Sequence, residues 1–144
     1  MTSLPRAEME AMFARRQKAW DNRDTAALSQ DYADDCVVDS PAGGGTLKGR
    51  DEVDRVRRAF FEGFPDLKLT TQRLLIDGDH VVQTSTMEGT DIGGFMGLVP
   101  TGKAFRVPAV FSYEFRGPLI YRERRIYDFT GMLVQVGLLK AKPV

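Results

Sequence analysis

The sequence is poor in the residues that build metal centres and disulfides. It contains one cysteine, Cys36, and one histidine, His80. A lone cysteine cannot form an intramolecular disulfide, and these two residues cannot supply a cysteine- or histidine-based zinc site. A single histidine also disfavours a Ser-His-Asp triad. We therefore expect no bound metal, and an unpaired cysteine fits a reducing cytoplasm.

The chain also lacks an excess of charge of either sign and any long apolar run. Lys plus Arg and Asp plus Glu each number 20. This balance gives no general attraction to nucleic acid or to anionic membranes. No apolar run approaches a membrane span, and the first residues, MTSLPRAEMEAMFARR, hold no secretory segment. We expect a cytoplasmic protein whose partners include neither nucleic acid nor membrane.

The residues that are present predict one α+β domain over residues 1–144. The length and a 42% apolar composition suffice for one core. Helical spacing of apolar residues, caps and stop signals predict three early helices, at residues 5–22, 25–33 and 49–64. Strand patterns predict extended segments at residues 36–39, 67–76, 81–90 and 105–115, and a long final strand within residues 118–137 that ends in a turn and a short apolar tail.

Helices followed by strands favour helices packed on one face of a curved antiparallel sheet. This layout leaves a cleft between the sheet and the first and third helices, and a mostly apolar cleft is the usual small-molecule site. The glycine-rich loop at residues 91–102 could cover it. The expected lining residues are Phe13, Trp20, Tyr32, Phe60, Phe64, Phe95, Phe111 and Tyr113. Trp20, Tyr32 and Tyr113 could equally be core residues.

Several stretches match one family in order. They are Trp20-Asp21-Asn22-Arg23-Asp24, Tyr32-Ala33-Asp34-Asp35, Leu47 to Val53, Ile76 to Val82, Gly89-Thr90 with the loop Gly93 to Gly102, and Asp128 with Gln135-Val136-Gly137. With these the chain resembles the SnoaL-like polyketide cyclases of the nuclear transport factor 2-like superfamily. The resemblance implies a cone-shaped sheet around the helices, an interior pocket, and a homodimer formed through the outer sheet face.

The same resemblance implies an aldol cyclisation that needs no cofactor. In the family, one aspartate near the end of the last long strand carries the proton, and Asp128 matches it. The family often has a histidine after Gly-Thr, where this chain has Asp91. It often has a histidine and a tryptophan where this chain has Glu123 and Arg124. Asp91 is then either a second acid at the pocket mouth or a turn residue.

Related enzymes of this fold match less well. Ketosteroid isomerases have an aspartate before the proline that matches Pro41, and here Ser40 stands there. Epoxide hydrolases of the limonene type have an arginine and an aspartate two residues apart on the strand before the last. The candidate here, Arg106-Val107-Pro108, has no acid.

Asp128 itself has two interpretations. In a regular strand it shares a face with Ile120 and Ile126, which would bury it in an apolar pocket, raise its pKa and suit acid/base catalysis. Alternatively, it pairs with an arginine or caps the turn at Gly131. Arg124, on the same parity, would bind a substrate oxygen unless a β-bulge breaks the alternation.

The sequence therefore predicts a cyclase- or isomerase-like enzyme acting on a small apolar carbonyl compound. The alternatives are a non-catalytic binding protein of the same fold, or a domain whose cleft is filled by core side chains.

Overall fold

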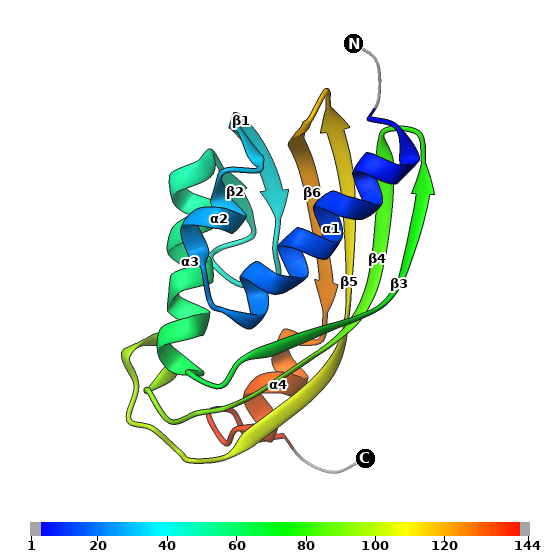
Figure 1. Ribbon diagram of the computed structural model, residues 1–144. Coiled ribbons are helices and arrows are strands. Elements are labelled where there is room, and N and C mark those ends of the chain that lie inside the picture. The colour runs from blue at the N-terminus through cyan, green and yellow to red at the C-terminus, as the bar shows by residue number, and fades with distance from the viewer. Residues whose placement is uncertain (1–3, 142–144) are drawn as a thin grey trace.

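Helices cover one face of a strongly curved six-stranded sheet in the computed structural model (Figure 1), which describes residues 4–141. In chain order the elements are α1 (Arg6–Asp21), α2 (Thr25–Ser29), β1 (Tyr32–Asp39), β2 (Thr46–Lys48), α3 (Arg50–Gly63), β3 (Lys68–Asp77), β4 (His80–Thr90), the 3₁₀ turn η1 (Phe95–Gly97), β5 (Ala104–Arg116), β6 (Leu119–Tyr127) and α4 (Phe129–Gln135). None of the helices between residues 4 and 141 is long and apolar enough to cross a membrane.

The sheet has the strand order β2-β1-β6-β5-β4-β3. Four of its five neighbouring pairs are antiparallel, and β1 runs parallel to β6. The final strand β6 is antiparallel to β5 on one side. On its other side it lies beside β1, which comes from the first part of the sequence and runs in the same direction as β6. The expected α+β class is confirmed, but the sheet is mixed rather than purely antiparallel, and it does not close into a barrel.

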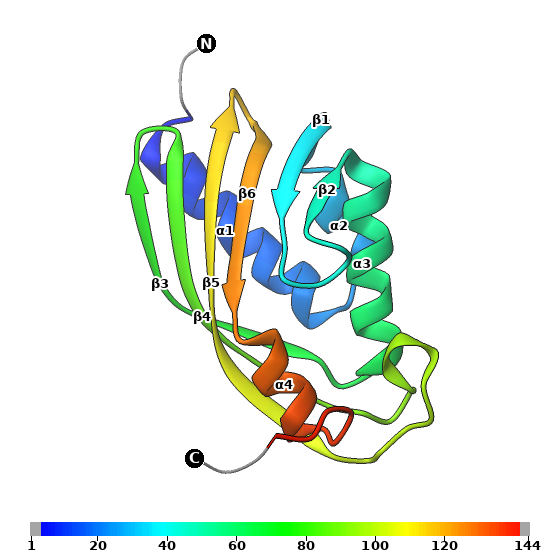
Figure 2. The ribbon, with the colours of Figure 1, turned by 180° about the vertical axis from the view of Figure 1, so that it is seen from behind.

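The three predicted helices are present, because their apolar spacing gives each one face to bury. Helix α1 buries Met9, Phe13 and Ala19 against the sheet, and α3 buries Val53 and Phe60. Figures 1 and 2 show both helices on the concave side of the sheet. Each of these buried faces also contains an arginine, and these two arginines help to form the site described below.

Three local features differ from the sequence-based expectation. Helix α2 ends at Ser29, since Tyr32 and Ala33 already belong to β1. The short strand β2 follows the glycines Gly43 to Gly45 and pairs with the end of β1. The apolar tail after β6 forms helix α4, which packs against β5 and lies in front of the lower part of that strand in Figure 2.

A β-bulge interrupts β6 near its start. Phe115 of β5 pairs with Ile120, whereas the preceding Glu114 pairs with Arg122, so β6 contains one extra residue at Tyr121. A bulge shifts the alternation of all later side chains by one position. Consequently Glu123 is buried, while Arg122 and the following even-numbered residues of β6 are exposed.

Candidate functional site

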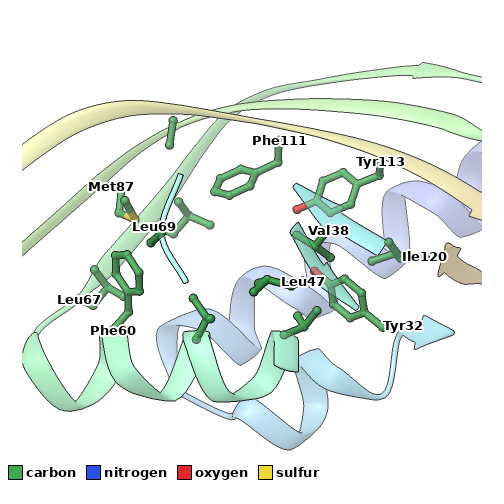
Figure 3. Packing of buried hydrophobic residues seen from close by; sticks show 14 of the residues in the cluster. Tyr32, Val38, Leu47, Phe60, Leu67, Leu69, Met87, Phe111, Tyr113 and Ile120 are labelled. Atoms are coloured by element: carbon green, nitrogen blue, oxygen red, sulfur yellow. The ribbon is translucent and has the colours of Figure 1, made fainter. Parts of the chain in front are cut away.

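A pocket lies inside the molecule, between the concave face of the sheet and helices α1 and α3. Figure 3 shows how its walls are built: Phe60 of α3 points toward the sheet beside Leu67 and Met87, and Phe111 and Tyr113 extend from β5. Its lining residues are Arg16, Trp20, Tyr32, Arg57, Phe60, Leu67, Met87, Phe111, Tyr113, Glu123, Arg125 and Tyr127. The free volume is about 30 Å³, which is room for ordered water and too little for a ring-sized ligand unless side chains move.

A buried carboxylate, Glu123, stands at the centre of the polar part of this pocket. Its Oε2 accepts a hydrogen bond from Nε of Arg125 at 2.5 Å, and its Oε1 accepts one from the hydroxyl of Tyr32. The Glu123 side chain is 1% exposed and that of Arg125 is 11% exposed. The bulge at Tyr121 creates this arrangement, because it turns residues 123 and 125 toward the interior.

The charges of this cluster fix its protonation at neutral pH. Burial alone would raise the pKa of Glu123, but the charge of Arg125 and the hydrogen bonds from Arg125 and Tyr32 outweigh it, so the pKa is lowered. Burial, together with the Glu123 charge, raises the pKa of Tyr32. The cluster therefore holds an ionised carboxylate beside a neutral phenol and a guanidinium cation.

A series of side-chain hydrogen bonds connects the pocket to helix α1. The hydroxyl of Tyr113 donates to Oε1 of Gln83 at 2.9 Å, and Nε2 of Gln83 donates to Oγ1 of Thr71 at 2.7 Å. Thr71 in turn donates to Oε1 of Gln17 at 2.7 Å. Burial raises the pKa of Tyr113 well above its usual value, so this phenol stays neutral and its orientation is fixed.

Two arginines from the helices complete the polar lining. Nη1 of Arg16 donates to Oδ2 of Asp31 at 2.9 Å and to the carbonyl oxygen of Leu28 at 3.0 Å. Nη1 of Arg57 donates to Oγ of Ser29 at 2.8 Å. Both guanidinium carbons lie 5.5 Å from the ring centre of Tyr32. The pocket lining therefore contains three arginines and one carboxylate.

One of these charged groups, Arg57, has a signal in the sequence itself. Arg57 lies four residues after Val53 and three before Phe60, on the stripe that α3 buries. An arginine at a core position must find a partner or a pocket. Glu123 was noted only as a departure from the family pattern, because strict alternation along β6 pointed it outward.

Five of the predicted cleft residues do line the pocket: Trp20, Tyr32, Phe60, Phe111 and Tyr113. The other three aromatic residues are core. Phe13 packs edge-on against Tyr113 with ring centres 5.2 Å apart. Phe64 and Phe95 pack on each other at 4.8 Å, and both are at most 2% exposed. They fill the end of the core because the backbone of Gly63 leaves space for the Phe95 ring.

Asp128 and Arg124 do not lie in the pocket. Asp128 is exposed and forms the N-cap of α4, where its Oδ1 accepts a hydrogen bond from the amide of Gly131 at 2.8 Å. The expected apolar burial of Asp128 is therefore wrong, because the bulge reverses the parity on which it depended. Arg124 is exposed on the outer face, 3.8 Å from Asp39. A catalytic role for Asp128 stays a prediction.

Asp91 is a fully buried loop residue. Its Oδ1 accepts a hydrogen bond from the amide of Phe95 at 3.1 Å, and its Oδ2 accepts hydrogen bonds from the amide and hydroxyl of Thr101. These contacts hold the glycine-rich loop closed on itself and correspond to the turn-residue interpretation. In residues 4–141, no three His, Cys, Asp or Glu side chains are grouped so that they could hold a metal ion.

The comparison with solved structures finds this architecture in bacterial proteins. AclR of Streptomyces galilaeus, a candidate hydroxylase, is 24% identical, with 96% of this chain and 87% of AclR covered and a TM-score of 0.81. IdmH of Streptomyces antibioticus, a candidate polyketide cyclase, is 28% identical, with 89% and 97% covered and a TM-score of 0.74. A SnoaL-like protein of a Jannaschia species is 18% identical, with 90% and 93% covered and a TM-score of 0.75.

The same fold occurs in solved structures described as nuclear transport factor 2-like proteins. The model of the SnoaL-like polyketide cyclase family matches residues 11–136, and the chain belongs to that family. No curated protein matches the chain significantly.

Proposed function

We propose that the protein is a cofactor-free acid/base enzyme that cyclises or isomerises an apolar carbonyl compound in the interior pocket. The observation that carries this proposal is the ionised Glu123 carboxylate, 4% exposed as a residue, between a phenol and a guanidinium in the interior pocket. A desolvated carboxylate next to fixed hydrogen-bond donors is suited to exchange a proton with a carbon acid. Family membership supports the same class of reaction.

In this proposal Glu123 takes a proton from a carbon adjacent to a carbonyl group, and its bond to Arg125 is released as it becomes neutral. The negative charge that develops on the substrate oxygen is stabilised by the arginines of the pocket. In a cyclisation, the carbanion then forms a carbon–carbon bond to a second carbonyl of the same molecule. The resulting alkoxide takes the proton back from Glu123, so no proton is consumed and no redox partner is needed.

Asp128 is the competing proton carrier, and it is the one that the family resemblance favours. Its carboxylate is exposed and accepts a hydrogen bond from a helix amide, which suits a helix cap. Tyr127, which precedes it, lines the pocket. A substrate that protrudes from the pocket could therefore reach Asp128, and variants of both acids are needed.

The test measures proton abstraction directly. 1-Indanone in D₂O, followed by NMR, reports the rate at which hydrogen next to the carbonyl is exchanged, whatever the natural substrate is. We expect the wild type to accelerate exchange, Glu123→Gln to lose at least about 100-fold of that acceleration, and Asp128→Asn to keep it. Loss in Asp128→Asn with retention in Glu123→Gln would transfer the role to Asp128.

A non-catalytic binding protein of the same fold is the second candidate. The observation that favours it is the ion pair between Glu123 and Arg125, because a carboxylate with a lowered pKa is a weak base. In that case the wild type would bind carbonyl compounds, seen as a change in Trp20 fluorescence, and would leave the exchange rate at its uncatalysed value.

A further inference from the structure

Arg57 has hydrogen-bonding capacity that the folded chain does not use. Its side chain is 1% exposed, and of its three guanidinium nitrogens only Nη1 has a partner, the hydroxyl of Ser29. Within residues 4–141, no atom accepts a hydrogen bond from Nε or Nη2. Buried donors of this kind are rare in folded proteins, since each unsatisfied donor is costly.

The counter-charge of Arg57 is also committed elsewhere. The nearest carboxylate, that of Asp54, is 3.9 Å from Nη1. Asp54 already accepts hydrogen bonds from Arg58 at 2.5 Å and from Ser29 at 2.7 Å. Burial lowers the pKa of Arg57, and the cations Arg125 and Arg16 lower it further, against the opposing effects of Tyr32 and the Glu123 carboxylate. Arg57 is therefore a desolvated cation whose nearest carboxylate is shared with Arg58 and Ser29.

The two unused nitrogens define the chemistry of a matching group. Nε–H and Nη2–H point in parallel from one edge of a guanidinium, which is the edge that receives the two oxygens of a carboxylate or one oxygen with two lone pairs. Arg57 lines the interior pocket, where three arginines face one glutamate. Both the geometry and the charge of the lining favour an oxygen anion over a neutral or cationic ligand.

We propose that the pocket selects ligands with a carboxylate or enolate oxygen, and that the Nε/Nη2 edge of Arg57 binds this oxygen. The inference deepens the proposed function by naming the substrate class, and to that extent it depends on the same pocket being the substrate site. During enolisation the oxygen held by Arg57 gains negative charge, so the same contact strengthens as the reaction proceeds.

The experiment compares anionic and neutral probes of equal shape, benzoate and benzamide, and includes formate as an anion only slightly larger than water. Binding is followed by the Nε–H resonance of Arg57 in ¹⁵N-labelled protein and by the fluorescence of Trp20, the single tryptophan, which also lines the pocket. We expect benzoate to bind about 10- to 100-fold more tightly than benzamide, and both anions to shift the Arg57 resonance.

Arg57→Met and Arg57→Lys are the test variants, and Arg55→Met is the matched control on the exposed side of the same helix. Arg57→Met should abolish the preference for benzoate and keep or raise the melting temperature, because it removes an unpaired buried cation. Arg57→Lys should weaken benzoate binding, since it keeps the charge and loses the paired donors. Arg55→Met should bind benzoate as the wild type does.

A merely structural arginine would give the opposite pattern. Lower stability of Arg57→Met with an unchanged benzoate preference in Arg57→Lys would overturn the inference, as would the absence of any shift of the Arg57 resonance with benzoate and formate. Selective benzoate binding without catalysed hydrogen exchange in 1-indanone would leave the inference standing and refute the proposed enzyme activity. Catalysed exchange without anion selectivity would refute the inference and leave the proposed enzyme activity standing.

Discussion

Replacing Glu123 by leucine should destabilise the protein far more than replacing the whole charge pair. The single substitution leaves the Arg125 guanidinium, 11% exposed, without its carboxylate, and leaves the Tyr32 hydroxyl without its acceptor. Removing one partner of a buried ion pair typically costs about 3–5 kcal/mol. That is a large part of the roughly 5–15 kcal/mol that stabilises a domain, and corresponds to a fall in melting temperature of about 6–20 °C.

The double variant Glu123→Leu/Arg125→Met removes both charges and should recover most of this loss, because an apolar pair of similar volume needs no desolvation. Adding Tyr32→Phe should recover more, since it removes the unpaired hydroxyl. Urea unfolding followed by far-UV circular dichroism gives the free energies for this cycle. Asp35→Ala, which breaks the exposed ion pair with Arg116, is the control and should have little effect.

The reasoning would be refuted by a loss below about 1 kcal/mol in Glu123→Leu, which is the range of a solvent-screened pair. It would also be refuted if the double variant were less stable than the single one. Either result would mean that water reaches the cluster freely in solution, and that the pocket offers Glu123 no desolvated environment.

Three further predictions concern alkaline stability, the glycine-rich loop and the outer sheet face. Burial raises the pKa of Tyr127 from 10 to about 12. The contribution of Tyr127 to stability is therefore complete below pH 10 and is lost as the pH rises toward 12. Urea unfolding midpoints measured across that pH range should fall less steeply for Tyr127→Phe than for the wild type. Gly93→Ala would place Cβ 1.8 Å from the carbonyl oxygen of Glu62, and we expect a loss of about 1–3 kcal/mol or more in urea unfolding, whereas its exposed neighbour Ile92→Ala should be neutral. If the outer face forms a homodimer, sedimentation should give twice the monomer mass, and Ile126→Glu, at a site 54% exposed in the single chain, should yield monomers; an unchanged mass would exclude that surface.

Much of the fold could be predicted because its signals are local. Two examples are the spacing of Met9, Phe13 and Ala19 in α1 and the strict alternation of β5 from Phe105 to Phe115. Each pattern lies within a single element that packs one face against the core. The order of helices and strands then limits the arrangement of layers. Strand β2 and helix α4 could not be predicted, because both are short and are stabilised by contacts with other elements, β2 with β1 and α3, and α4 with β5.

The candidate site was predicted only in part, and the reason is the register of one strand. The pocket-lining aromatic residues on α1, α3 and β5 were identified, since their periodicity is regular. The charged groups on β6 were assigned to the wrong faces, because no residue type in the segment around Tyr121 marks a bulge. Arg57 could have been recognised from its position between Val53 and Phe60, where a charged residue contradicts the apolar stripe of α3.

The extra residue in β6 has an evolutionary implication. Deleting Tyr121 alone would turn Arg122, Arg124 and Ile126 inward and would bring Glu123 and Arg125 to the outside, without altering any of these five residues. A single in-frame loss of three nucleotides could thus exchange the reactive groups of the cavity for those of the exterior. Relatives with and without this insertion would be expected to perform different reactions, even where their aligned residues are the same.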